Sequence, residues 1–128
     1  MNRRRKVLYV EDNPENRRLV RLILESEGYE VVEAEDGSAA VESALTHAPD
    51  LILMDMHLPK LDGYEATRQI RKLPGFSRVP IVALTASVLK ADKDRAIEAG
   101  CVGFIQKPID VDRFPRQVNE FFSDTQSS

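Results

Sequence analysis

Short apolar runs alternate along this chain with segments in which apolar residues recur every three or four positions. The runs are typical of strands buried on both faces of a parallel sheet, and they occupy residues 7–10, 29–34, 51–54, 80–84 and 102–105. Segments with helical spacing lie between the runs and after the last one. Strand and helix therefore alternate five times, which predicts a doubly wound α/β sheet covered by helices on both faces.

The limits of the last two predicted helices depend on a glycine and a proline. The segment from Ala86 to Ala99 is expected to be one helix closed by Gly100. The last helix contains Pro115, which limits where it begins. With Asp112 as the cap, the proline takes the third helical position, where its missing N–H costs nothing; with Asp110 as the cap, it costs a hydrogen bond. The later start is therefore preferred.

Polar side chains follow several of the predicted strands, at the point where each strand ends. Glu11, Asp12, Asp55, Thr85 and Lys107 occupy these positions. A parallel sheet brings the carboxyl ends of its strands to one rim, where ligands of such folds bind. Carboxylate oxygens suit Mg²⁺, and the cation would offset the repulsion between neighbouring acids and an incoming phosphate. Asp55 is the candidate nucleophile, Thr85 a donor to a phosphoryl oxygen, and Lys107 a partner of Asp55 or of the phosphate.

Each of these positions also has a purely structural explanation. Glu11 and Asp12 fit the start of the following helix, Thr85 is suited to capping the next helix, and a lysine after a strand is usually solvated. Pro108 directly after Lys107 makes a cis peptide bond a candidate, which would aim the lysine inward. The coincidence of all these residues at one rim favours a functional site.

Composition narrows the class of protein. The chain has 128 residues, 42% of them hydrophobic and 30% charged, and a formal net charge of -3, which gives no reason to expect binding to nucleic acid or membrane. Its one cysteine, Cys101, cannot form an internal disulfide, and no apolar run is long enough to cross a bilayer. We therefore expect a cytoplasmic protein with one domain over residues 1–123 and a disordered tail over residues 124–128.

The segments VLYVEDN, DLILMDMHLPKLDG, IVALTAS and FIQKP closely resemble the receiver domain of two-component response regulators, and their spacing fits nearly the whole chain. The similarity is to single-domain receivers of the chemotaxis type. It implies a flavodoxin-like, three-layer (βα)5 sandwich with the parallel strand order 2-1-3-4-5.

The resemblance also implies roles for the rim residues. Asp55 would accept a phosphoryl group from a histidine kinase or a phosphotransfer protein. Asp12, Asp55 and the backbone carbonyl of His57 would bind Mg²⁺, for which Mn²⁺ can substitute, and Glu11 would contact the metal through water or through another ligand. The domain would be a signalling switch and not a turnover enzyme, because it would catalyse only its own phosphorylation and dephosphorylation.

The same resemblance predicts how the signal leaves the site. Thr85 and Lys107 would bind the phosphoryl oxygens, and Thr85 would move toward Asp55 on phosphorylation. Phe104 matches the switch aromatic of the family, although an aromatic in the core of a short strand is an equally good explanation. The surface of the fourth helix, fifth strand and fifth helix would then change and bind a downstream protein. We expect a monomer or a weak dimer.

Other interpretations stay open at this stage. The chain is expected to stand alone without an output domain, or else to be a receiver taken from a larger regulator or hybrid kinase. An Mg²⁺-dependent phosphohydrolase with an aspartate nucleophile is the main alternative, but it usually needs a second acid where this chain has His57. A flavin-binding electron carrier would need a phosphate-binding loop where the acids Glu11 and Asp12 stand.

Overall fold

The computed structural model describes residues 4–126, and within them five parallel strands form a single sheet. The strands are β1 (Lys6–Val10), β2 (Glu30–Ala34), β3 (Leu51–Asp55), β4 (Ile81–Thr85) and β5 (Gly103–Gln106). Their spatial order is β2-β1-β3-β4-β5, which confirms the order that the resemblance implied. Because all five strands run the same way, their carboxyl ends share one rim.

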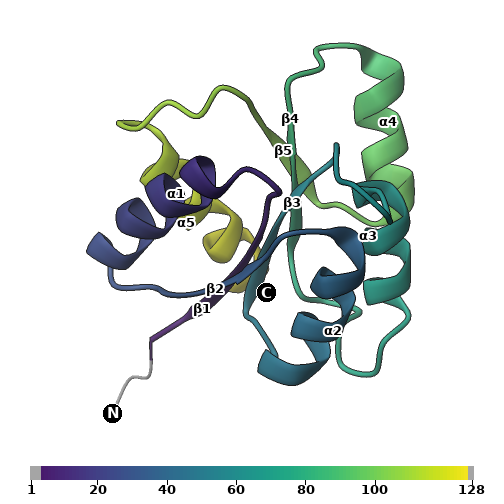
Figure 1. The fold of residues 1–128 in the computed structure, drawn as a ribbon, viewed down its shortest axis with the longest axis horizontal. Helices are drawn as coiled ribbons and strands as arrows, with labels where there is room; N and C mark the ends of the chain where they lie inside the picture. Colours follow the sequence, from purple (N-terminus) through teal and green to yellow (C-terminus); the bar gives the residue numbers. More distant parts are fainter. Residues whose placement is uncertain (1–3, 127–128) are drawn as a thin grey trace.

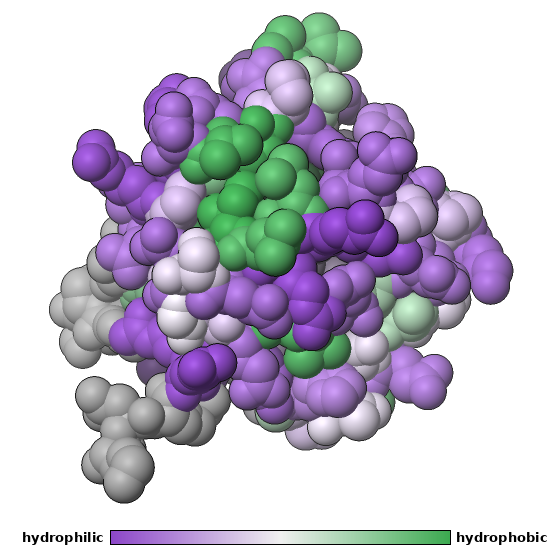
Figure 2. All heavy atoms as spheres, turned by 60° about the vertical axis from the view of Figure 1, so that its left-hand side comes forward, coloured by the Kyte–Doolittle hydropathy of each residue, from purple (hydrophilic) through white to green (hydrophobic). Residues whose placement is uncertain are grey.

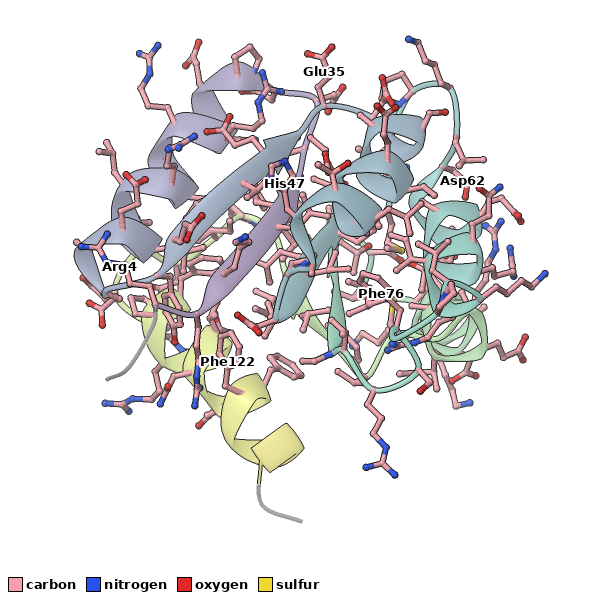
Figure 3. The ribbon with its side chains drawn as sticks, turned by 90° about the horizontal axis from the view of Figure 1, so that it is seen from below. Arg4, Glu35, His47, Asp62, Phe76 and Phe122 are labelled. Atoms are coloured by element: carbon pink, nitrogen blue, oxygen red, sulfur yellow. The ribbon has the colours of Figure 1, made fainter. Side chains whose placement is uncertain are left out.

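Helices cover both faces of the sheet. They are α1 (Pro14–Ser26), α2 (Gly37–His47), α3 (Gly63–Arg71), α4 (Lys90–Ala99) and α5 (Phe114–Gln126). Figure 1 shows α1 and α5 together on one side of the strands and α2, α3 and α4 on the other. The view from below in Figure 3 shows the same three layers, with Phe122 in the α5 layer and Phe76 in the layer of α3. The predicted doubly wound architecture is confirmed.

Alternating residues of the central strands build two separate cores. In β1, Val7 and Tyr9 pack with the buried side chains of α1 and α5, whereas Leu8 and Val10 pack with those of α2, α3 and α4. Successive side chains of a strand point to opposite faces, so a strand covered on both faces must be apolar at every position. This is the physical origin of the continuous apolar runs.

Capping residues fix most helix starts where the sequence suggests. Asn13 accepts a hydrogen bond from the backbone N–H of Asn16 and precedes Pro14, so α1 begins as an Asn-Pro pair predicts. Asp36 caps α2 through the N–H of Ala39 in the same way. These short contacts place the amino ends of α1 and α2 at the rim.

Two helix starts differ from the predicted ones. The fourth helix begins at Lys90 and not at Ala86, because Ser87 holds the preceding segment in an extended turn described below. The last helix begins at Phe114, one residue after the start that Asp112 as the cap would give, so the later start is right but Asp112 is not the cap. In the turn before the helix, Asp110 Oδ1 accepts the backbone N–H of Asp112, and the Asp110 backbone oxygen accepts that of Phe114. Pro115 is then the second helical residue, where a missing N–H is tolerated.

The sequence predicts a disordered tail over residues 124–128. In the structure the carboxyl-terminal helix continues to Gln126. Residues 127–128 of that tail lie outside the described part of the chain, and the domain limits stay a prediction. Among residues 4–126, no helix has the length and apolar character needed to span a membrane.

Candidate functional site

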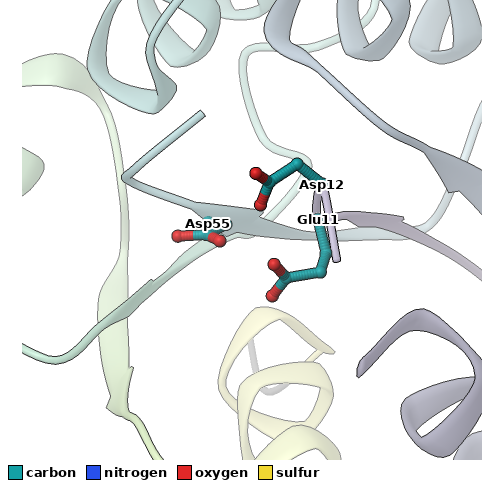
Figure 4. A group of neighbouring side chains, drawn as sticks. All are labelled: Glu11, Asp12 and Asp55. Carbon is teal, nitrogen blue, oxygen red and sulfur yellow. The ribbon is translucent and has the colours of Figure 1, made fainter. Parts of the chain in front are cut away.

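Three carboxylates meet at the rim where β1 and β3 end. Glu11 and Asp12 directly follow β1, and Asp55 is the last residue of β3. One carboxylate oxygen from each lies within 4.8 Å of the others. Figure 4 shows Glu11 and Asp12 leaving the chain on opposite sides, with Asp55 facing them from the neighbouring strand. The register that pairs Val10 with Met54 brings these strand ends side by side.

Glu11 is one of two buried acids in the set, with 2% of its surface exposed. Its Oε1 accepts hydrogen bonds from the Tyr9 hydroxyl at 3.2 Å and from Lys107 Nζ at 3.0 Å, and its Oε2 accepts the backbone N–H of Asn13 at 3.2 Å. Both carboxylate oxygens are therefore occupied by protein donors. This arrangement makes Glu11 an anchor for Lys107, whereas the exposed Asp12 has its carboxylate free of hydrogen bonds to other described residues.

Asp55 is 3% exposed and has donors on both oxygens. Lys107 Nζ donates to Oδ2 at 3.2 Å, and the backbone N–H of His57 donates to Oδ1 at 3.0 Å. The two donors fix the orientation of the carboxylate, whose oxygens are potential nucleophiles. The side chain of His57 is exposed, so the residue contributes to this contact through its backbone.

Lys107 directly follows the edge strand β5 and reaches both buried acids from there. The Lys107–Pro108 peptide bond is cis, and the backbone N–H of Lys107 donates to the carbonyl oxygen of Thr85 at 2.8 Å. Burial lowers the pKa of the ammonium, but hydrogen bonds to Glu11 and the charge of Asp55 outweigh burial and raise this pKa above its ordinary value. Lys107 is therefore a fixed positive charge at neutral pH.

Thr85 ends β4 and is 5% exposed. Its Oγ1 accepts the backbone N–H of Ser87 at 3.0 Å, and its hydroxyl proton has no protein acceptor among the described residues. The Ser87 hydroxyl in turn donates to Asp92 Oδ2 in the first turn of α4 at 2.6 Å. Thr85 is thus linked to α4 while its hydroxyl remains able to donate to a new oxygen.

Phe104 lies on β5 with 38% of its surface exposed. Its ring faces Lys93, whose Nζ is 4.4 Å from the ring centroid. The interpretation of Phe104 as a core aromatic is wrong, because at this edge strand its side chain points away from the two cores.

Gly63 sets the course of the chain after Asp55. A Cβ at this position would collide with the backbone oxygen of Asp55 and with Met56, and the Gly63 N–H donates to the Met56 oxygen at 3.4 Å. The amino end of α3 therefore packs directly on the end of β3, which only glycine permits. This contact supports the loop that carries His57.

The acid cluster fits a divalent cation. Three carboxylates face one ammonium, so the site keeps an excess of negative charge, and all its side-chain donors to a metal are hard oxygens. Asp12 and Asp55 each bring a carboxylate oxygen within 4.8 Å of the other and of Glu11. The residues present therefore fit Mg²⁺.

Sequence reasoning missed two contributors to this site. Tyr9 is fully buried and donates to Glu11; burial, reinforced by the charge of Glu11, raises the pKa of its hydroxyl, so the neutral donor form persists. Its signal was its position two residues before Glu11, since such residues share one face of a strand. Asp92 was missed because its link to Thr85 depends on the unpredicted turn at Ser87.

Comparisons with known proteins agree with this geometry. The sequence profile of the response regulator receiver domain family matches residues 7–119. The polar-differentiation response regulator DivK of Brucella anthropi is 38% identical over 118 residues, which is 92% of this chain and 96% of the relative. The DivK protein of Brucella ovis matches with the same identity and coverage.

Solved structures with the same fold include closely similar receivers. The receiver domain of the sensor histidine kinase PA1611 from Pseudomonas aeruginosa, determined with a magnesium ion coordinated in its active-site cleft, is 40% identical with a TM-score of 0.86, covering 94% of this chain and 99% of the other. The chemotaxis protein CheY4 of Vibrio cholerae is 28% identical with a TM-score of 0.89, covering 93% and 99%.

Proposed function

This chain belongs to the response regulator receiver domain family of two-component signalling, and on that premise we propose that Asp55 is its phosphorylation site. The observation that carries the proposal is the pair of donors on this buried carboxylate: Lys107 on one oxygen and the His57 N–H on the other. They orient the Asp55 carboxylate at the rim, beside Asp12. Asp55 is the buried acid that is itself the last residue of a strand, β3, at the centre of the sheet.

The phosphodonor is a histidine kinase or a phosphotransfer protein. A carboxylate oxygen of Asp55 attacks the phosphorus of a phosphohistidine, the O–P bond forms as the N–P bond breaks, and the released imidazole takes up a proton. Hydrolysis returns the carboxylate and inorganic phosphate when water attacks the same phosphorus. The domain performs chemistry only on its own side chain.

Asp12, Asp55 and the backbone carbonyl of His57 would hold Mg²⁺, with Glu11 contributing through water, and Mn²⁺ would substitute for it. When bound, the cation would neutralise charge that develops on the transferred phosphoryl group. Support comes from the hard oxygen donors of the cluster and from the magnesium ion described for the Pseudomonas aeruginosa receiver. Lys107 then neutralises a phosphoryl oxygen, because it already lies beside Asp55 Oδ2.

A groove beside Lys107 offers a docking place for the phosphodonor protein. It has a volume of about 330 Å³ and is formed by α1, including Leu19 and Val20, and by Pro108 and Ile109 after β5. Figure 2 shows an apolar area on this side of the molecule, ringed by hydrophilic residues. Because Lys107 lines both the groove and the site, a protein bound here would present its phosphohistidine close to Asp55.

Signalling follows from the free hydroxyl proton of Thr85 and the outward position of Phe104. Thr85 donates to a phosphoryl oxygen once its loop moves toward Asp55, Phe104 turns inward, and the surface of α4, β5 and α5 changes for a downstream protein. Shifting such an equilibrium from mostly inactive to mostly active requires about 5.5 kcal/mol of differential stabilisation. The experiment that tests the proposal is phosphorylation by a small phosphodonor with Mg²⁺, located by mass spectrometry.

A further inference from the structure

The two halves of α4 are held in different ways. Its buried side chains, Ala96 and Ala99, both lie in the second half of the helix. The two residues before the helix, Val88 and Leu89, are each 63% exposed. Figure 1 shows the connection from β4 rising above the rim before α4 descends beside α3. Within the described residues, the start of α4 therefore lacks a buried apolar anchor and depends on polar contacts.

The first polar contact connects α4 to Thr85. Ser87 donates its backbone N–H to Thr85 Oγ1 at 3.0 Å, and its hydroxyl donates to Asp92 Oδ2 at 2.6 Å. The Ser87 hydroxyl also accepts the backbone N–H of Leu89 at 3.1 Å, which replaces the missing side-chain cap of the helix. A movement of Thr85 toward Asp55 draws the backbone of Ser87 with it and strains the bond to Asp92.

The second contact connects α4 to Phe104. Lys93, next to Asp92, places its ammonium 4.4 Å from the centroid of the exposed ring. A cation over the face of an aromatic ring is attracted by the ring quadrupole. This attraction exists only while Phe104 points outward, because an inward rotation removes the ring from Lys93.

We propose that Asp92 and Lys93 are positioning residues that together hold the unphosphorylated arrangement of this domain. Asp92 restrains the loop of Thr85 through Ser87, and Lys93 restrains Phe104. The inference rests on the proposed function, in which phosphorylation of Asp55 displaces both Thr85 and Phe104. Contacts present only in the resting arrangement oppose the active one, so removing either contact strengthens binding of a phosphoryl group at Asp55.

The test measures binding of beryllofluoride, a phosphoryl mimic, in the presence of Mg²⁺ by titration calorimetry. Lys93→Met keeps the alkyl chain and removes the charge, and we expect it to bind about two- to fivefold tighter than wild type. We expect Asp92→Ala to bind up to about tenfold tighter and Asp92→Asn, which keeps an acceptor oxygen, to return toward wild type. Lys90→Met is the matched control, because Lys90 is exposed and its one ion pair within the described residues is with Asp94 on the same helix; its affinity should equal that of wild type.

Hydrogen exchange provides the reciprocal measurement. Beryllofluoride should speed exchange in the first turn of α4 in wild type, and Asp92→Ala should show this faster exchange without the mimic. If Asp92 and Lys93 only stabilised the fold, their replacement would lower the free energy of unfolding and leave the affinity for beryllofluoride unchanged. Unchanged or weaker affinity in Asp92→Ala and Lys93→Met, beside normal binding by wild type, overturns the inference alone. Wild type that does not bind the mimic, or Asp55→Asn that binds it equally, overturns the proposed function and this inference with it.

Discussion

Lys107 donates a hydrogen bond to Asp55 Oδ2 across 3.2 Å, although the two residues are 52 positions apart in the chain. The same ammonium makes a 3.0 Å bond to Glu11 Oε1. One cation thus offsets two buried carboxylates at the ends of adjacent strands. In the proposed reaction a phosphoryl oxygen becomes the new partner of Lys107, so the charge that stabilises the resting site also stabilises the product.

Replacing Lys107 tests this dual role. Lys107→Met should lower the free energy of unfolding by about 1–2 kcal/mol at pH 7, because Glu11 and Asp55 lose their shared cation. The loss should shrink when Mg²⁺ is added, since the metal supplies positive charge to the same cluster. Guanidinium denaturation followed by circular dichroism, with and without Mg²⁺, measures both effects. Lys72→Met, at an exposed position at the end of α3, is the control and should change little.

The stability difference between wild type and Lys107→Met should depend on pH in a way that follows from the raised pKa of Lys107. The pKa is higher in the folded chain than its ordinary value of 10.5, so the contribution of the ion pair is complete below pH 10.5 and disappears as the pH rises through the folded value. The stability difference between wild type and Lys107→Met should therefore be constant from pH 7 to pH 9 and narrow above pH 10.5. A difference that already narrowed between pH 7 and pH 9 would contradict this assignment.

Thr85→Ala separates phosphorylation from its consequence. The variant retains Asp55, Lys107 and the acid cluster, so it should still accept a phosphoryl group. It lacks the hydroxyl that would bind the phosphoryl oxygen, so phosphorylation should no longer change hydrogen exchange in α4. Thr46→Ala, at an exposed position of α2, should respond as wild type does. A full response in Thr85→Ala would show that the signal leaves the site by another route.

Gly63→Ala tests the close contact between the start of α3 and the end of β3. Alanine normally stabilises a helix relative to glycine, but here its Cβ would collide with the Asp55 backbone oxygen. We expect a loss of about 1–3 kcal/mol in the free energy of unfolding and slower phosphorylation of Asp55. Gln69→Ala, at an exposed position of the same helix, should stay within about 0.5 kcal/mol of wild type. A stabilised Gly63→Ala variant would show that the loop yields easily.

Cys101 should resist alkylation in the folded protein. It is 4% exposed, and burial raises the pKa of its thiol to about 11, so little thiolate forms at pH 8. Iodoacetamide treatment followed by mass spectrometry should show slow modification in buffer and rapid, single modification in guanidinium, since the chain has one cysteine. Equal rates in the two conditions would contradict the buried position.

The strands could be predicted from the sequence because each central strand is apolar at every position, as burial on two faces requires. Their spatial order came from the resemblance, since no local pattern specifies which strands pair. The acids, Thr85 and Lys107 were predictable as a group because parallel strands deliver their ends to one rim.

The predicted start of α4 and the predicted cap of α5 are wrong because single hydrogen bonds decide both. The segment after Thr85 contains no helix-breaking residue, yet the bonds from Ser87 to Thr85 and Leu89 keep it out of the helix. Similarly, Asp110 and not Asp112 receives the backbone N–H groups before α5. Serine and aspartate can bond to several nearby backbone groups, and tertiary packing decides which bond forms.

Phosphoryl transfer to Asp55 is the step on which the proposed signalling depends. Wild type, Asp55→Asn and Asp12→Asn are incubated with acetyl phosphate and Mg²⁺, and intact mass and peptide mapping by mass spectrometry locate the product. We expect one phosphoryl group on the wild-type peptide that contains Asp55, none on Asp55→Asn, and reduced incorporation in Asp12→Asn or after chelation of Mg²⁺. The same phosphoryl adduct on wild type and on Asp55→Asn would contradict the assignment of Asp55.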